Sequence, residues 1–196
     1  NEMKKLDIKW TCQMIVSNVD SSLLSCMKKS GCYLISFGFE SYSDVILKSM
    51  KKPITPQQIN YAIKKCMELN IGIQGNFIFG DIVETKETSE LTLDYWKKNC
   101  KGQVKLGFIQ PYAGSYIYGW CIAKGIIKDE VDYMSKKIWD ENYFNITENM
   151  SNKDIEDLVN KIKTLINSGY FKNVIPKEIY KLQGKEDRYA VKIDCP

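Results

Sequence analysis

The chain of 196 residues is 44% hydrophobic and 27% charged, with a formal net charge of +4, which is ordinary for one globular domain with its own core. It contains no histidine, and this excludes histidine-based catalytic triads, general bases and metal sites within the chain. The mild, scattered basic charge gives little support to nucleic-acid binding, and no apolar run approaches the length that crosses a membrane.

The first part of the chain alternates short apolar runs with amphipathic ones. A strand is predicted at 7–16 and a second strand at 32–38. Between them, Asp20 is placed to cap a helix over 21–30, because its side-chain oxygens can accept from the first backbone amides of the helix. A short helical turn at 43–50 follows the second strand.

The alternation continues with the clearest helix start of the sequence, Thr55-Pro56-Gln57-Gln58. Threonine is a good N-cap, proline suits the first helical position, and a glutamine three residues after the threonine can close a capping box. The elements predicted from here are a helix at 56–69, a strand at 71–80, a helix at 86–99, a strand at 104–110 and a short helix at 115–124.

This order of elements predicts an α/β fold with a parallel sheet. Each strand is separated from the next by a segment long enough for a right-handed crossover helix. The strand segments are almost continuously apolar, which is typical of a sheet covered on both faces. Four βα units fit either an open doubly wound sheet or part of a (β/α) barrel, and in both cases functional side chains gather at the carboxyl ends of the strands.

Beyond residue 125 the alternation stops. The 126–150 segment carries aromatic residues without clear periodicity, and an amphipathic helix is predicted at 152–168. The closing RYAVKIDCP is expected to form a strand. Its Cys195-Pro196 either opens a C-P-x-C metal knuckle or belongs to an ordinary terminal strand.

The seven cysteines are odd in number, and no two are spaced as metal or redox pairs usually are. This favours reduced, mostly buried thiols and a cytoplasmic location over a disulfide framework. The chain begins NEMKKLDIKW, without an initiator methionine or the apolar core of a signal peptide, so we expect it to be part of a longer protein.

Polar side chains and glycines cluster where the predicted strands end. Glu40 and Ser41 follow the second strand in the stretch ISFGFES. The other polar groups expected at this rim are Asn76, Asp81, Glu84 and Gln110, with Lys51 and Lys52 nearby. The glycines that would let the backbone approach a ligand are Gly38, Gly75, Gly80 and Gly114. The alternative interpretation is structural: a solvated turn after the second strand, and a helix cap after the third.

Four spaced stretches resemble radical S-adenosylmethionine (radical SAM) enzymes. GFES followed by SDVILKSMKKPIT resembles the fourth-strand segment of that family, and GNFIFGDIVET resembles the fifth. IKWTCQMIVSNVDSSLLSCMKKSGC resembles the third βα unit, and PYAGSYIYGWCIAKGII resembles the segment after the sixth strand. The likeness is greatest to the branch that carries a cobalamin-binding domain, with members similar to anaerobic magnesium-protoporphyrin ester cyclases.

The resemblance implies a fold and a chemistry. In the family, a partial barrel of six βα units holds a [4Fe–4S] cluster through a C-x-x-x-C-x-x-C motif, and S-adenosylmethionine bound to the cluster is cleaved to a 5′-deoxyadenosyl radical. Residues 1–127 match strands three to six of that partial (β/α) barrel, and 128–196 form a C-terminal helical extension with a terminal strand. This sequence contains neither the three-cysteine motif nor the first two strands.

The implied parent is a radical SAM iron–sulfur oxidoreductase that acts on a small-molecule substrate, with cobalamin as a further cofactor. This chain would carry the half of the site that contacts the methionine and nucleoside, without the cluster ligands, and would be inactive alone. No residue of the chain is expected to be catalytic or to bind a metal.

Three residues are implied at the methionine end of S-adenosylmethionine. Glu40 matches the fourth-strand polar residue that contacts the methionine or ribose portion, with Ser41 beside it. Lys52 matches a basic residue that pairs with the methionine carboxylate, and Lys51 is the second choice for this role.

Five further residues are implied at the nucleoside end. Asn76 matches a fifth-strand residue that hydrogen-bonds the ribose hydroxyls. Ile78 and Gly80 belong to the strand that packs on adenine, and Gln110 and Tyr112 lie where the backbone after the sixth strand meets the adenine edge.

Two other functional classes stay open. A non-catalytic α/β module that recognises a nucleotide or a partner would bind a nucleoside strongly by itself, whereas a hydrolase or aldolase is disfavoured by the absence of histidine and of a G-x-S-x-G elbow. A partial barrel would also expose the edge of the 7–16 strand. We therefore expect self-association through that edge, or its coverage by 126–150 or 170–195.

Overall fold

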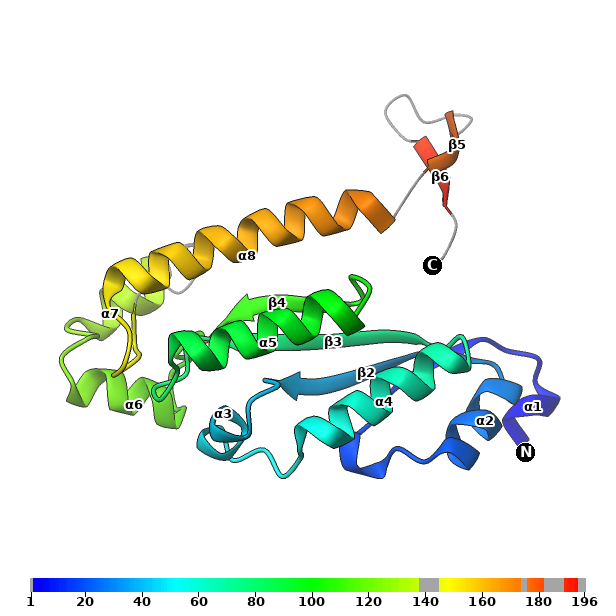
Figure 1. Ribbon diagram of the computed structural model, residues 1–196, viewed down its shortest axis with the longest axis horizontal. Helices are drawn as coiled ribbons and strands as arrows, with labels where there is room; N and C mark the ends of the chain where they lie inside the picture. The colour runs from blue at the N-terminus through cyan, green and yellow to red at the C-terminus, as the bar shows by residue number, and fades with distance from the viewer. Residues whose placement is uncertain (1, 138–144, 174–175, 182–188, 194–196) are drawn as a thin grey trace.

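The computed structural model describes residues 2–137, 145–173, 176–181 and 189–193. Its centre is a four-stranded parallel sheet in which the strands lie in the order of the chain, β1-β2-β3-β4 (Figure 1). The strands are β1 (Trp10–Gln13), β2 (Cys32–Glu40), β3 (Gly72–Phe79) and β4 (Val104–Phe108). The prediction of an α/β fold built from four parallel βα units is confirmed.

The helices begin where the sequence supplies capping side chains. The Asp20 carboxylate accepts from the amides of Ser22 and Leu23, and Thr55 and Thr85 each close a capping box. The helices are α1 (Glu2–Lys5), α2 (Ser21–Lys29), α3 (Asp44–Ser49), α4 (Pro56–Glu68), α5 (Lys86–Asn99), α6 (Tyr116–Ala123), α7 (Glu130–Asp132) and α8 (Asn152–Asn173), with a 3-10 turn at Val16–Asn18 and a π-helical turn at Tyr133–Lys137. Within the described ranges, no helix is both long and apolar enough to cross a bilayer.

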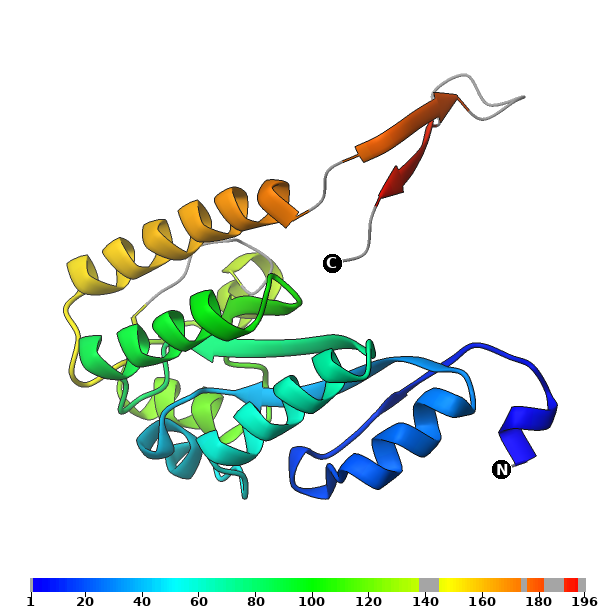
Figure 2. The ribbon, with the colours of Figure 1, turned by 45° about the vertical axis from the view of Figure 1, so that its right-hand side comes forward.

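The main core lies between one face of the sheet and a layer of helices. Helices α2, α4 and α5 cover this face, and α8 lies beside α5 (Figures 1 and 2). Phe39 and Phe77 of the strands, Ile59 of α4 and Leu93 of α5 are completely buried there. Burying a large apolar side chain contributes about 1.5–3 kcal/mol, so this interface is the principal source of stability.

The opposite face of the sheet carries small and polar residues. Along β3, Phe77 is buried whereas Gln74 and Asn76 are exposed. The register aligns Asn76 with Gly38 of β2 and with Lys105 of β4. The expectation that both faces are covered is therefore wrong for the described part of the chain. Mainly apolar residues on the helix-covered face alternate with mainly small or polar residues on the open one.

Two strands depart from the expected pattern. β1 is shorter than the predicted 7–16, and the chain leaves it through the 3-10 turn. β5 (Pro176–Lys181) was not predicted, and it pairs with β6 (Tyr189–Ile193) as a separate antiparallel hairpin. The predicted terminal strand is therefore confirmed as β6, while Cys195 lies outside the described residues.

Most of the described cysteines are core residues. Cys32, Cys66, Cys100 and Cys121 are buried. Burial raises the pKa of Cys66 to about 12, so its thiol stays protonated and unreactive. These side chains act as small apolar packing groups, and the predicted burial of the thiols is confirmed for them.

Candidate functional site

Glu40 ends β2 at the carboxyl edge of the sheet in a strained conformation. The Ser41 amide donates to the Phe39 carbonyl at 2.8 Å, so these residues form a γ-turn with Glu40 at its centre, at φ 62°. A positive φ at that position is rare for a residue with a side chain. The register with β3 also shifts between Gly38 and Glu40. The γ-turn and the register shift together set the direction in which this carboxylate leaves the strand end.

The Glu40 carboxylate pairs with the Lys52 ammonium beside Gly38. The distance from Oε1 to Nζ is 2.9 Å, and the two side chains are 19% and 33% exposed. A Cβ added to Gly38 would lie 2.8 Å from Glu40 Oε1 and 3.0 Å from Lys52 Nζ. The Lys52 amide donates to the Leu47 carbonyl at 2.8 Å, which ties this lysine to the end of α3. Glycine at position 38 therefore leaves the space that the ion pair occupies.

Asn76 lies next to Gly38 on the open face of the sheet. The two residues are aligned across β2 and β3. Both border a hollow of about 380 Å³ that also touches Ser36 and the end of β1 at Gln13. Ile78 follows on the same face, because strand side chains alternate. The structure thus places Asn76 and Ile78 on the side of the sheet where the ion pair stands.

Two residues expected to approach a ligand are engaged in packing. The Ser41 hydroxyl is buried, lies 3.2 Å from the Thr92 hydroxyl and accepts from the Ser43 amide at 3.1 Å, so its ligand contact stays a prediction. Gly75 faces the helix layer, where an added Cβ would lie 2.5 Å from the Phe39 ring. The interpretation of Gly75 as a point of ligand approach is wrong, because this glycine makes room for a core aromatic ring.

Glu84 closes the loop that follows β3. Its Oε2 accepts from the Gly80 amide at 2.6 Å, and its own amide donates to the Asp81 carbonyl at 2.9 Å. The side chain is 1% exposed, and burial raises its pKa to about 7 from an ordinary 4.5. Gly80 adopts φ 88°, which glycine tolerates without strain. These contacts favour the structural interpretation of Glu84, and they fix the position of Asp81.

Gln110 and Tyr112 follow β4, with β3 between them and the strand that ends in Glu40. Gln110 is partly buried, and the Tyr112 side chain is exposed. Pro111 between them is buried, and its carbonyl accepts from the Tyr133 hydroxyl at 3.0 Å. The structure therefore places these two residues at the carboxyl edge of the sheet, on its β4 side.

The sequence does not predict the γ-turn. It indicates Lys51 and Lys52 as the cations near this rim, but not that Lys52 is the one that pairs with Glu40. A glutamate carries no local signal for positive φ, which glycine and asparagine adopt most readily. The pairing depends on how α3 returns the chain to the strand end, and that is a tertiary feature.

The chain is similar in sequence to proteins named as methyltransferases. It is 34% identical over 122 residues to an uncharacterized methyltransferase of Pyrococcus horikoshii, which covers 62% of this chain and 27% of that protein. It is 30% identical over 116 residues to the bacteriochlorophyllide d C-12(1)-methyltransferase of Chlorobaculum tepidum, which covers 58% of this chain and 25% of that protein. The chain therefore spans about a quarter of the length of these curated relatives. No family model matches it.

The fold is shared with a radical SAM enzyme of known structure. Coproporphyrinogen III oxidase from Escherichia coli, a radical SAM enzyme, matches 89% of this chain with a TM-score of 0.55 and 10% identity, over 36% of its own chain. At this identity the likeness concerns the fold alone. The four-stranded parallel sheet with its helices is consistent with a partial radical SAM barrel.

Proposed function

We propose that this chain is the C-terminal part of a radical SAM barrel and supplies the half of the S-adenosylmethionine site that contacts the methionine and nucleoside. The Glu40–Lys52 ion pair beside Gly38, at the carboxyl edge of a parallel sheet, carries the proposal. The shared fold and the names of the sequence relatives support it. The same proposal divides the chain into a barrel part at 1–127 and a C-terminal extension at 128–196.

The ion pair offers one charge of each sign to the amino-acid end of the cofactor. The Lys52 ammonium would bind the methionine carboxylate, and Glu40 would accept from the amino group or from ribose hydroxyls. In the free chain the two side chains neutralise each other at 2.9 Å. A bound zwitterion would replace that single pair with two charge-assisted contacts.

The nucleoside end would lie along the open face and the strand ends. The Asn76 amide would hydrogen-bond the ribose hydroxyls, because its side chain stands exposed next to Gly38. The residues proposed around adenine are Ile78, Gly80, Gln110 and Tyr112.

The reaction chemistry would belong to a longer parent protein. In the parent, bound S-adenosylmethionine would supply a methyl group, or a 5′-deoxyadenosyl radical if an iron–sulfur cluster there reduced it. The sequence has no C-x-x-x-C-x-x-C motif, and in the described part of the chain no three cysteine, histidine or carboxylate side chains gather where they could hold a metal ion. These residues do not fit a [4Fe–4S] cluster. We therefore place the cluster in another part of the parent, and this chain alone would be inactive.

The names of the relatives favour methyl transfer as the reaction of the parent. The oxidoreductase activity implied by the sequence resemblance would start from the same bound cofactor. The branch with a cobalamin-binding domain, the likeness to anaerobic magnesium-protoporphyrin ester cyclases and a cytoplasmic location are the finer parts of this proposal.

A non-catalytic nucleotide- or partner-binding module is the alternative, and the missing three-cysteine motif favours it. The two functions differ in whether tight binding of the ligand requires an iron–sulfur cluster. A self-sufficient module binds a nucleoside tightly without a cluster, whereas half of a radical SAM site binds S-adenosylmethionine tightly only when the cluster is present.

The substitution Gly38→Ala in the parent protein tests the proposed site. The new Cβ would push apart the ends of two flexible side chains, so the fold should persist while the affinity for S-adenosylmethionine falls at least about tenfold. Equilibrium dialysis with labelled S-adenosylmethionine measures the affinity, and chromatography of 5′-deoxyadenosine measures cleavage.

Gly119→Ala is the matched control, because nothing lies within 4 Å of a Cβ at that exposed position of α6, and Gly119 is not among the residues proposed to contact the cofactor. The proposal predicts unchanged affinity for this variant. Equal losses in both variants, or none in Gly38→Ala, would contradict it.

A further inference from the structure

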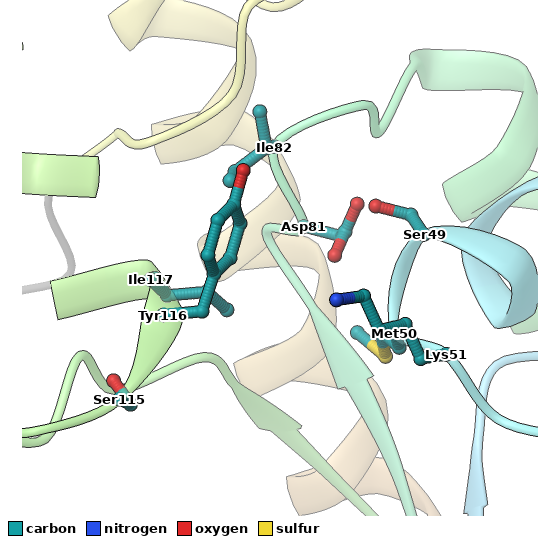
Figure 3. A pocket seen from close by; sticks show the side chains of 8 residues that line it. All are labelled: Ser49, Met50, Lys51, Asp81, Ile82, Ser115, Tyr116 and Ile117. Atoms are coloured by element: carbon teal, nitrogen blue, oxygen red, sulfur yellow. The ribbon is translucent and has the colours of Figure 1, made fainter. Parts of the chain in front are cut away.

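A second hollow lies at the carboxyl edge of the sheet, between the end of α3, the loop after β3 and the start of α6 (Figure 3). Its volume is about 210 Å³, below the ~300–1,000 Å³ of pockets for drug-sized ligands. The side chains that line it and could contact a ligand are those of Ser49, Lys51, Asp81, Ile82, Tyr116 and Ile117. None of these residues belongs to the Glu40–Lys52 pair or to the hollow beside Asn76.

Asp81 supplies a fixed carboxylate to this hollow. It is 2% exposed, and its Oδ1 accepts from the Val83 amide at 3.1 Å. Figure 3 shows the carboxylate directed into the hollow, on the side of the Ser49 hydroxyl. The loop that carries it is held by Glu84 from within and by the Glu148 amide, which donates to the Ile82 carbonyl at 2.8 Å. A buried carboxylate with a fixed direction can select a ligand that donates to it.

Lys51 supplies the opposite charge from the other wall. Its ammonium lies 5.7 Å from the centroid of the Tyr116 ring, and the described residues include no ion pair between Lys51 and Asp81. Lys51 adopts φ 54° directly after α3, where glycine is the favoured residue. A lysine at this position costs backbone energy, so the helix end alone does not explain its presence.

We propose that this hollow binds a small zwitterion of the amino-acid class. Its carboxylate would pair with Lys51, its ammonium with Asp81, and its apolar side chain would lie against Tyr116, Ile82 and Ile117. A simple anion would leave the Asp81 carboxylate unpaired, and a simple cation would leave Lys51 unpaired. Only a ligand with both charges satisfies both walls. The proposal goes beyond the S-adenosylmethionine site, because it rests on Lys51 and Asp81 and not on the Glu40–Lys52 pair. It gives Lys51 a role other than the methionine contact for which the sequence makes it the second choice.

The test uses L-phenylalanine as the probe, with 2-phenylethylamine and 3-phenylpropionate as analogues that each lack one charge. Backbone amide resonances of the chain are followed by NMR during titration. We expect saturable shifts at Lys51, Asp81 and Tyr116 with L-phenylalanine, and affinities for both analogues lower by about tenfold or more. The absence of saturable shifts with L-phenylalanine, or equal binding of the three compounds, overturns the proposal.

Lys51→Gly separates binding from folding. Glycine relieves the positive φ and removes the ammonium, so the melting temperature should stay equal or rise while the affinity for L-phenylalanine falls about tenfold. Lys101→Gly is the matched control, since Lys101 also has positive φ, at 46°, but precedes β4 at the opposite edge of the sheet. Equal loss of affinity in both variants would mean nonspecific charge attraction and would overturn the proposal.

A third variant separates this proposal from the proposed cofactor site. Gly38→Ala should leave the affinity for L-phenylalanine unchanged, because Gly38 does not line this hollow. Loss of phenylalanine binding in Gly38→Ala would show that the probe occupies the Glu40–Lys52 site, and it would overturn the assignment to Lys51 and Asp81. Failure of S-adenosylmethionine to bind would leave the phenylalanine result standing.

Discussion

At the residue scale, Glu84 is the side chain with the clearest pH dependence. Its pKa of about 7 in the folded chain exceeds the ordinary value of 4.5, because burial disfavours the charged carboxylate. The folded chain therefore binds more protons than the unfolded chain between these two pH values. The stabilisation from the protonated form, about 3 kcal/mol at most, is complete below pH 4.5 and is lost as the pH rises through 7.

The substitution Glu84→Gln should flatten that dependence. The amide oxygen can still accept from the Gly80 amide, but the side chain no longer titrates. Urea denaturation from pH 4.5 to 8 should show the free energy of unfolding falling in the wild type and changing much less in the variant. Glu87→Gln, on the exposed first turn of α5, should keep the wild-type slope. A wild-type slope in Glu84→Gln would refute this account of the loop.

Gly75 gives a second prediction at this scale. The Phe39 ring lies where a Cβ would be, and it is stacked on Phe37 at 5.3 Å between centroids. Gly75→Ala should therefore destabilise the chain by about 1–3 kcal/mol, the usual cost of overpacking a core. Denaturation midpoints measure this, with Gly107→Ala as the control, because nothing lies within 4 Å of a Cβ at that position of β4. An unchanged midpoint in Gly75→Ala would contradict the assigned packing role.

At the element scale, α8 packs on the main core and forms an ion pair with α5. Ile155, Leu158 and Ile162 enter the main core, and Lys86 of α5 pairs with Asp154 at 2.6 Å. The apolar residues recur at helical spacing, which is why the sequence predicts an amphipathic helix here.

Leu158→Ala should lower the free energy of unfolding by about 2–5 kcal/mol, because it opens a cavity between α8 and the rest of the core. Glu156→Ala, exposed on the same helix, should change it by less than about 0.5 kcal/mol. Urea denaturation of both variants measures the difference. A loss as small in Leu158→Ala as in Glu156→Ala would show that α8 is not part of the cooperative core.

The elements differ in how far the sequence predicts them, and the reason is local. The capping boxes at Thr55 and Thr85 fix the starts of α4 and α5, since those signals lie within a few residues of the helix. β5 escapes prediction because Ile179 and Tyr180 are exposed, and without burial there is no alternating apolar pattern to read. Within the part of the chain that the structure describes, this segment is a strand because it pairs with β6.

At the scale of the whole molecule, the open sheet face and the edge of β1 distinguish this chain from a closed α/β fold. The topology follows from the order of elements, but the apolar strand sequences hide the fact that one face carries Ser36, Gly38 and Asn76. Whether a sheet face is covered depends on which helices or other chains pack on it, and the strand sequences alone do not show this. In the described residues, no strand pairs with the outer edge of β1.

We propose that the edge of β1 drives self-association. Its backbone groups are available for pairing, and Leu6, Ile8 and Ile15 beside it are exposed. Sedimentation velocity over a range of concentrations should show association that Thr11→Lys weakens. Gln57→Lys, on the exposed side of α4, should leave association unchanged. A chain that stays monomeric throughout, or an equal effect of both substitutions, would contradict this proposal.

An NMR titration of the chain with S-adenosylmethionine tests the proposed cofactor site most directly. If Glu40, Lys52 and Asn76 form half of that site, binding should be weak and saturable in the millimolar range, with amide shifts centred on these three residues. Absence of shifts at these three residues, or tight binding below the micromolar range without any cluster, would contradict it.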